Sequence, residues 1–224
     1  TRPAVHEIAV VGLGPGAPEL LTIEARAALT SGAPVFWRTR RHPVVDQIDP
    51  TASRPSFDDL DASRDGSTTV DTAIVDRLLR EAAGGPLVYA VPGHPLVAAP
   101  SVCLLLERVR DKGIPVRIVP GVSLLDAVAA ALAIDPVASN LQIVDATTLA
   151  AASDRDPFRG GTLPISPLRP AVIVGFAGLR LAAAAKAALL RLYPPDTPVT
   201  IVQPGGNSNE SPERLRLAGL DAGA

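Results

Sequence analysis

The feature that most constrains the fold of this chain is an arrangement that occurs three times. In each case a short apolar run ends at a turn of glycine and proline, and a segment with helical periodicity follows. The turns have the sequences GLGPG at 12–16, PGHP at 92–95 and PGVS at 120–123. Strands that alternate with helices form parallel sheets, and the turns after such strands meet at one edge of the sheet. The sequence therefore predicts an α/β fold with three glycine turns at that edge.

The rest of the pattern extends this alternation over two halves. Short β-branched runs predict strands at 8–11, 35–37, 87–91, 116–119, 141–144, 171–175 and 199–202. Apolar residues at helical spacing predict helices at 22–29, 70–83, 98–111, 124–133 and 179–192. The polar, proline-rich segments at 39–68 and 153–170 are expected to be irregular, with at most one short strand in the first.

A boundary near Pro120 divides these elements into two domains. Residues 1–119 form an N-terminal α/β domain with a mainly parallel sheet, and residues 120–224 form a C-terminal α/β domain with a mixed sheet. We expect a cleft between them, because small-molecule sites often lie between domains.

Composition excludes several classes of protein. A net charge of −2 and 3% aromatic residues argue against a nucleic-acid partner. The apolar runs are too short for a membrane-spanning helix, and the chain enters its first strand without room for a signal peptide. The single cysteine, Cys103, lies in an apolar helical run and is expected to be a buried thiol. These features predict a cytoplasmic protein.

Two residues in the turns are candidates for chemistry. His94 can be a general base near neutral pH, or a turn residue that offers a polar contact. Ser123 can cap the helix at 124–133 or direct its hydroxyl into the cleft. The other histidines, His6 and His42, lie far from His94 in the sequence, and no acid or cysteine stands at ligand spacing, so no metal site is expected.

The first turn also matches a loose dinucleotide fingerprint, G-x-G-x-x-A, through Gly12, Gly14 and Ala17. Two features disfavour this interpretation. The helix begins only near Thr22, its expected N-cap, whereas a dinucleotide site needs a helix that opens directly from the turn. The second strand ends in Trp37 and Arg38 where such a site needs an acid. A dinucleotide-dependent oxidoreductase is therefore the weakest of the functional hypotheses.

Taken together, the turns resemble the motifs of the S-adenosylmethionine-dependent tetrapyrrole methylase family. GLGPGAPELLT at 12–22 is similar to the family opening GxGPGdpeLLT, PGHP stands where the family has GGDP, and PGVSLL stands where it has PGvTSA. VYAVPGHPLVA at 88–98 and IVPGVSLLDAVAAALAIDP at 118–136 are most similar to the methylase-like half of proteins fused to a MazG-type nucleotide pyrophosphohydrolase. The resemblance covers nearly the whole chain.

The resemblance implies a site for S-adenosyl-L-methionine and no metal. The implied cofactor-binding residues are Pro15, Pro92, Gly93, His94, Val97, Ser123, Leu124, Phe176 and Gly205, with Leu141 and Gln142 as weaker candidates. His94 is also the implied catalytic residue, and it replaces the acid of the family motif. That replacement leaves the methyl acceptor open.

The implied activity is methyl transfer to a small-molecule acceptor. Arg38, Arg40 and Arg41 follow a predicted strand and can either bind an anionic acceptor or lie in a solvated loop. The alternative is a non-catalytic module that binds the cofactor and regulates a fused nucleoside triphosphate pyrophosphohydrolase. The resemblance and the apolar, alanine-rich helices also imply a homodimer.

Overall fold

The chain divides into two compact units, and the division falls inside helix α6 (Leu124–Leu132). The computed structural model describes residues 6–62, 67–110, 112–151, 165–174, 182–202 and 212–220. The described residues of the first unit end at 127 and those of the second begin at 128. All three glycine turns therefore lie in the first unit.

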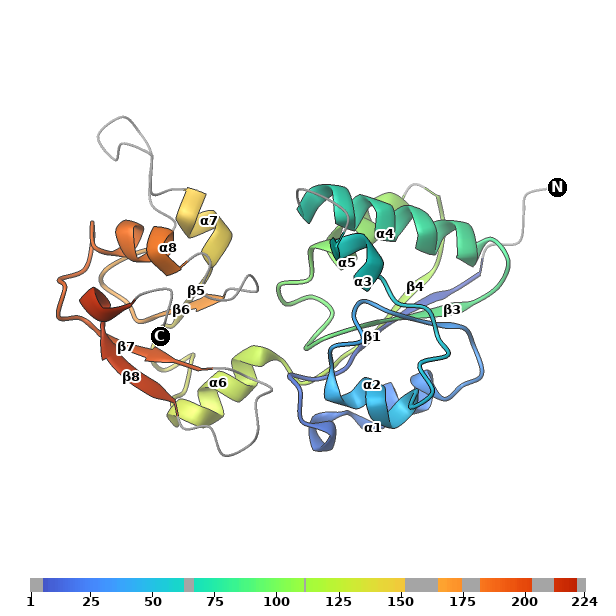
Figure 1. The fold of residues 1–224 in the computed structure, drawn as a ribbon, viewed down its shortest axis with the longest axis horizontal. Coiled ribbons are helices and arrows are strands. Elements are labelled where there is room, and N and C mark those ends of the chain that lie inside the picture. Colours follow the sequence, from blue (N-terminus) through green and yellow to red (C-terminus); the bar gives the residue numbers. More distant parts are fainter. Residues whose placement is uncertain are drawn as a thin grey trace. The chain divides into compact units, whose positions relative to one another are not determined.

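A four-stranded parallel sheet forms the centre of the first unit (Figure 1). Its strands, in the order β2-β3-β1-β4, are β2 (Val35–Trp37), β3 (Leu87–Val91), β1 (Ile8–Gly12) and β4 (Val116–Val119). Its helices are α1 (Ile23–Leu29), α2 (Pro43–Ile48), α3 (Asp58–Ala62), α4 (Ser67–Ala82) and α5 (Pro100–Arg110). The predicted α/β fold class and these four strands are confirmed.

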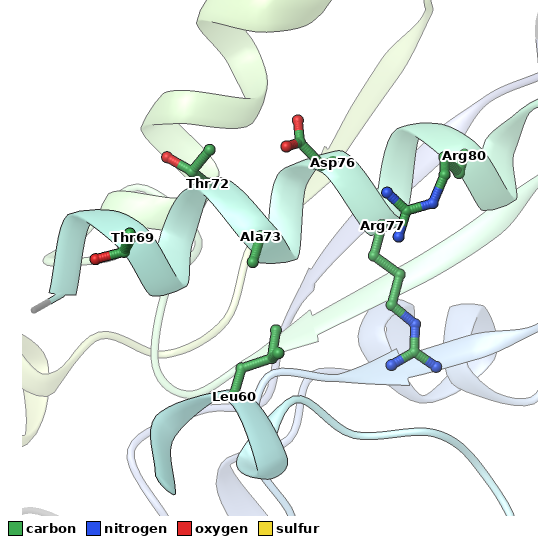
Figure 2. Close-up of a pocket in the computed structure, with 7 residues that line it drawn as sticks. All are labelled: Leu60, Thr69, Thr72, Ala73, Asp76, Arg77 and Arg80. Atoms are coloured by element: carbon green, nitrogen blue, oxygen red, sulfur yellow. The ribbon is translucent and has the colours of Figure 1, made fainter. Parts of the chain in front are cut away.

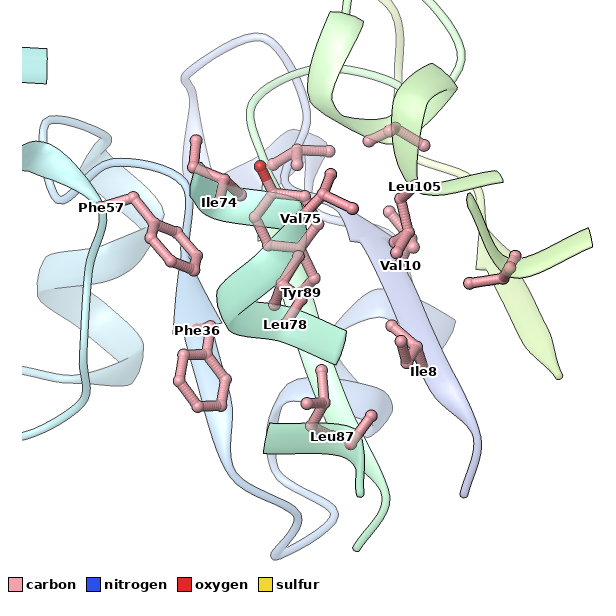
Figure 3. Packing of buried hydrophobic residues seen from close by; sticks show 14 of the residues in the cluster. Ile8, Val10, Phe36, Phe57, Ile74, Val75, Leu78, Leu87, Tyr89 and Leu105 are labelled. Carbon is pink, nitrogen blue, oxygen red and sulfur yellow. The ribbon is translucent and has the colours of Figure 1, made fainter. Parts of the chain in front are cut away.

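Helices cover both faces of this sheet, which explains why β1, β2 and β3 are continuous apolar runs. Ile8 and Val10 point to one face, where they pack with residues of α4 and α5. Figure 3 shows this core, in which Tyr89 of β3 lies beside Leu78. Ala9 and Val11 point to the other face and pack with residues of α1 and α2. The sheet is therefore fixed from both sides, and the turns that follow its strands have a firm base.

The segment at 39–68 is not irregular, so that prediction was wrong. It contains α2, α3 and the start of α4, and the strand content of its described residues is a single bridge between Trp37 and Ser56. α2 begins with Pro43 at its first turn, a position that tolerates the missing N–H of proline. Phe57 then anchors the segment, because its ring packs against Phe36 and edge-on against Tyr89. These tertiary contacts order the segment, although its polar composition favours irregular structure.

A buried carboxylate organises the loop that follows α2. Asp49 accepts hydrogen bonds from Trp37 Nε1 at 3.2 Å, from Ser53 Oγ at 2.8 Å and from the backbone nitrogens of Ser53 and Arg54 at 3.0 Å each. Arg40 pairs with it at 3.2 Å. Burial alone would raise the pKa of Asp49, but the hydrogen bonds outweigh it and lower the pKa from 3.8 to about 2.

We expect this carboxylate to make stability depend on pH. Since the folded pKa lies below the unfolded one, the contribution is complete above the unfolded value of 3.8 and is lost as the pH falls towards 2. The shift corresponds to about 2 kcal/mol. Urea unfolding should show wild type more stable than Asp49→Asn near neutral pH, with the difference shrinking as the pH falls through this window. A difference that does not change with pH would contradict this assignment.

The expectation for Cys103 needs correction, and one helix of the structure was not predicted. Cys103 is exposed, because α5 directs Val102, Leu105 and Val109 to the core and Cys103 to the other side. The second unit contains a helix, α7 (Ala146–Ala151), that the sequence pattern did not predict. It is short and carries two threonines, so its helical signal is weak.

The second unit pairs its strands two by two. Besides α7 and a 3₁₀ helix at Leu217–Gly219, its described elements are β5 (Gln142–Asp145), β6 (Ala171–Val174), α8 (Ala182–Leu189), β7 (Pro198–Ile201) and β8 (Glu213–Arg216). β5 and β6 are parallel, whereas β7 and β8 are antiparallel. Leu149 of α7 and Ala188 of α8 are fully buried in the core of this unit. None of the helices described in either unit has the length and apolarity needed to cross a membrane.

Candidate functional site

The three glycine turns meet at the carboxyl edge of the parallel sheet. β1 lies between β3 and β4, so the turns that follow these strands are neighbours. A Cβ atom on Gly12 would lie 2.5 Å from the carbonyl oxygen of Gly93 and 2.6 Å from the nitrogen of Gly121. A Cβ on Gly121 would collide with the same Gly93 oxygen. The turns therefore meet at this edge, as the sequence predicted. They pack backbone against backbone, and only glycine fits at Gly12 and Gly121.

Hydrogen bonds join the first two turns into one unit. The Gly93 nitrogen donates to the Gly14 carbonyl at 2.7 Å, and the Gly14 nitrogen donates back to the Gly93 carbonyl at 3.2 Å. Gly14 and Gly93 have φ angles of 81° and 67°, which residues other than glycine adopt only at an energetic cost. Thr22 connects the third turn, since its Oγ1 donates to the Pro120 carbonyl at 3.3 Å. The same oxygen caps α1 by accepting from the Ala25 nitrogen, as expected.

The second turn exposes a backbone surface next to a histidine. Pro92, Gly93, His94 and Val97 are all half-buried, and a Cβ on Gly93 would meet no atom within 4 Å. His94 Nδ1 accepts a hydrogen bond from the Leu96 nitrogen at 3.1 Å. A neutral imidazole in this arrangement carries its proton on Nε2 and can donate it. To act as a base, His94 would first have to release Leu96 or exchange its proton between the two nitrogens.

Ser123 caps the start of α6, which was one of the two roles that the sequence allowed. Its Oγ accepts from the Leu125 nitrogen at 3.0 Å, and Asp126 Oδ2 accepts from the Ser123 nitrogen at 2.8 Å. This reciprocal pair is a capping box with an aspartate in the third position, and it fixes the start of α6. Ser123 is buried and Leu124, the first residue of the helix, is half-buried. Contact of either residue with a ligand stays a prediction.

Pro15 belongs to the first turn, where it is half-buried between Gly14 and Gly16. No described contact brings the other remaining implied residues to these turns. Phe176 and Gly205 lie outside the described residues. The strand before Gly205, β7, is paired antiparallel with β8.

Gln142, a weaker candidate, has its side chain committed elsewhere. Its Nε2 donates to the carbonyls of Ser166 and Arg169, at 2.6 Å and 3.0 Å, and its Oε1 accepts from the Ser166 nitrogen at 2.8 Å. The amide therefore holds the segment before β6. Leu141, its half-buried neighbour, makes a backbone hydrogen bond to Pro136.

One of the three arginines that follow β2, Arg40, serves the loop rather than an open site. Arg40 pairs with Asp49 and donates through Nη2 to the carbonyls of Ala52 and Arg54. Arg38 is half-buried and has partners of its own. Arg41 is exposed. Burial would raise the pKa of Asp58, but hydrogen bonds from Thr39 and Arg40 outweigh it and lower that pKa, with a smaller contribution from the charge of Arg41. Of the three, Arg40 is thus fully engaged in holding the chain.

His42 is a residue of this site that the sequence did not indicate. It is 7% exposed, and its Nε2 lies 3.0 Å from the Gly14 carbonyl oxygen. Burial lowers the pKa of His42 from 6.5, although the hydrogen bond to Gly14 opposes this shift. The contact joins residues 28 positions apart. The only local signal is the His-Pro pair, which is typical of a helix start and says nothing about Gly14.

A separate groove of about 740 Å³ lies between α3 and α4 (Figure 2). Its lining includes Leu60, Asp76, Arg77 and Arg80, and none of its lining residues belongs to a glycine turn. The Arg77 guanidinium stacks over the ring of Phe57 at 5.5 Å, so it covers the aromatic core. No group of histidine, cysteine and acidic residues suited to a metal ion occurs in the part of the chain that the structure describes.

Comparison with known proteins places this geometry in a family. The chain is 34% identical over 216 residues to the protein YabN of Bacillus subtilis (strain 168), an alignment that covers 96% of this chain and 42% of YabN. The chain therefore spans less than half the length of this curated relative.

Several solved structures have the same fold. Uroporphyrin-III C-methyltransferase from Thermus thermophilus, complexed with S-adenosylhomocysteine, has a TM-score of 0.63 and 26% identity, over 96% of this chain and 90% of that one. Precorrin-6Y methylase from Archaeoglobus fulgidus has a TM-score of 0.64 and 16% identity, over 97% and 93%. Diphthine synthase has a TM-score of 0.65 and 15% identity, over 96% and 83%; at these last two identities the likeness concerns the fold alone.

A family model of Tetrapyrrole (Corrin/Porphyrin) Methylases matches residues 7–221, nearly the whole chain. The three turns and the α/β fold agree with that match. The chain therefore belongs to the tetrapyrrole (corrin/porphyrin) methylase family.

Proposed function

We propose that the chain is an S-adenosylmethionine-dependent methyltransferase that binds its methyl donor against the second glycine turn. The observation that carries this proposal is the packing of Gly12, Gly93 and Gly121. Backbone atoms fill the space beside Gly12 and Gly121, whereas the space beside the Cα of Gly93 is free. Family membership supports it, as does the likeness to a uroporphyrin-III C-methyltransferase that was solved with S-adenosylhomocysteine.

The residues present fit such a donor. A peptide without a side chain allows a ligand to approach the backbone N–H and C=O groups directly. Gly93 offers this surface because the space beside its Cα is free within 4 Å, while Pro92 and Pro95 restrict the backbone on either side. The hydrogen-bonded bridge from Gly93 to Gly14 holds the surface in place. A ligand therefore meets a backbone that is already ordered.

The proposed reaction needs placement more than acid–base chemistry. S-adenosylmethionine supplies a methyl group on a sulfonium, which is already electrophilic. Holding an acceptor in line with that methyl group can contribute about 7–11 kcal/mol to lowering the barrier. We propose that His94 donates its Nε2–H to the donor or to the acceptor, since Nδ1 is engaged by Leu96. An acceptor that must lose a proton would require the other tautomer of His94, which then acts as the base.

Calorimetry tests the proposal without knowledge of the acceptor. We expect S-adenosylhomocysteine and S-adenosylmethionine to bind at one site per chain, and NADH to give no binding heat under the same conditions. Binding of NADH without binding of S-adenosylhomocysteine would overturn the proposal in favour of a dinucleotide enzyme.

A second candidate function is a regulatory module that binds the same cofactor for a fused MazG-type nucleoside triphosphate pyrophosphohydrolase. It is favoured by the length of YabN, of which this chain spans 42%, and by His94 in place of the family acid. Incubation with methyl-labelled S-adenosylmethionine and a small-molecule cell extract separates the two. Label transferred to an acceptor, and lost in Gly93→Ala, supports the methyltransferase. Binding without transfer supports the module.

A further inference from the structure

His42 connects α2 to the first glycine turn through a buried side chain. The histidine immediately precedes Pro43 and caps α2, because its Nδ1 accepts from the Val44 nitrogen at 3.3 Å. An N–H group can donate only to an unprotonated nitrogen, so the neutral ring carries its proton on Nε2. That nitrogen lies 3.0 Å from the Gly14 carbonyl oxygen and donates to it. The geometry thus fixes both the tautomer and the direction of the hydrogen bond.

The Gly14 carbonyl receives two hydrogen bonds, one from each side. His42 Nε2 donates from α2, and the Gly93 nitrogen donates from the second turn at 2.7 Å. A carbonyl oxygen has two lone pairs, so its capacity is filled. Glycine loses more conformational freedom on folding than any other residue, and the first turn contains three glycines in five residues. A turn of this composition needs external contacts to hold one conformation, and His42 supplies one.

Burial keeps the His42 ring in the neutral form that serves both contacts. His42 is 7% exposed, and its pKa is lowered by desolvation, so the imidazole is neutral near neutral pH. A proton added to Nδ1 would face the Val44 N–H and break the cap. The side chain therefore has one protonation state that satisfies both partners.

We infer that His42 is a positioning residue for the methyl-donor site. Its Nε2–H holds the Gly14 carbonyl, and the bridge between Gly14 and Gly93 passes this constraint to the peptide on which the donor binds. The inference rests on the proposed function, since it assigns His42 a role toward the same ligand. His42 does not touch the ligand; it acts through Gly14.

Two variants separate the two hydrogen bonds of His42. In His42→Asn the amide oxygen takes the place of Nδ1 and can still cap α2, but no donor reaches Gly14. In His42→Gln the amide nitrogen takes the place of Nε2 and can donate to Gly14, but the cap is lost. Each variant removes one hydrogen bond, so we expect both to lower the melting temperature by a similar amount, about 2–4 °C.

Binding of S-adenosylhomocysteine, measured by calorimetry on wild type and both variants, tests the inference. We expect about tenfold weaker binding to His42→Asn, and binding to His42→Gln within about threefold of wild type. Equal affinities of His42→Asn and wild type would overturn the inference and leave the proposed function intact. Equal losses in both variants would overturn it too, because they would indicate a purely structural role. Failure of the wild type itself to bind would overturn the proposed function and the inference with it.

Discussion

Replacing Gly12 or Gly121 by alanine is expected to lower the free energy of unfolding by about 3 kcal/mol or more. The new Cβ would enter the space of backbone atoms of a neighbouring turn, 2.5 Å from the Gly93 oxygen in the case of Gly12. Backbone atoms cannot turn away as a flexible side chain can, so strands β1, β3 and β4 would have to separate at this edge. Urea unfolding of the purified variants measures the loss.

Gly85→Ala is the matched control for this experiment. Gly85 precedes β3, and a Cβ placed on it meets no atom within 4 Å. Its backbone does not have the positive φ of Gly14 or Gly93. Alanine there should leave stability within about 1 kcal/mol of wild type, with a gain expected from the stiffer unfolded chain. Unfolding curves that coincide for Gly12→Ala and Gly85→Ala would show that the turns do not pack as described.

Gly93→Ala is expected to have the opposite profile, with modest loss of stability and large loss of ligand binding. The new Cβ meets no protein atom, so the cost to folding is that of a non-glycine residue at a φ of 67°, about 1–2 kcal/mol. The same methyl group would occupy the surface against which we propose that the donor binds. A clash there should weaken the binding of S-adenosylhomocysteine by about tenfold to a hundredfold.

Gly113→Ala separates backbone strain from ligand contact. Gly113 has a φ of 63° and equally open surroundings, but it precedes β4 and so lies at the opposite edge of the parallel sheet. It should lose the same stability as Gly93→Ala and bind S-adenosylhomocysteine like wild type. If both variants bind equally well, Gly93 does not form part of the site.

The described strands other than β8, and the glycine turns, could be predicted from sequence because their signals are local. Ile8 to Val11 is a continuous apolar run that stops at Gly12, and both the strand and its end follow from that pattern. Thr22 was recognised as the cap of α1 because a threonine directly precedes the helical periodicity. The meeting of the turns followed from parallel topology alone.

The environment of the site could not be predicted because its contacts are distant in sequence. α2 is short, so its amphipathic pattern extends over few residues. The helix is held in place by Asp49, which follows it in the sequence and accepts a hydrogen bond from Trp37, which precedes it. Arg40 has the sequence context of a ligand-binding arginine, yet its partners are Asp49 and two carbonyls. His42 contacts Gly14 only because the fold brings α2 to the first turn. Such contacts between distant residues cannot be inferred from the composition of a segment.

An NMR titration of the uniformly ¹⁵N-labelled chain with S-adenosylhomocysteine tests the central claim most directly. Glycine amide signals are well separated in such spectra, and those of Gly12, Gly14, Gly93 and Gly121 report on the three turns individually. We predict saturable shifts that are largest at Gly93 and Gly14, with Gly85 and Gly113 unchanged. Saturable shifts that affect only the amide signals of residues lining the groove between α3 and α4 would contradict the claim that the glycine turns bind the methyl donor. An unchanged spectrum would contradict it too.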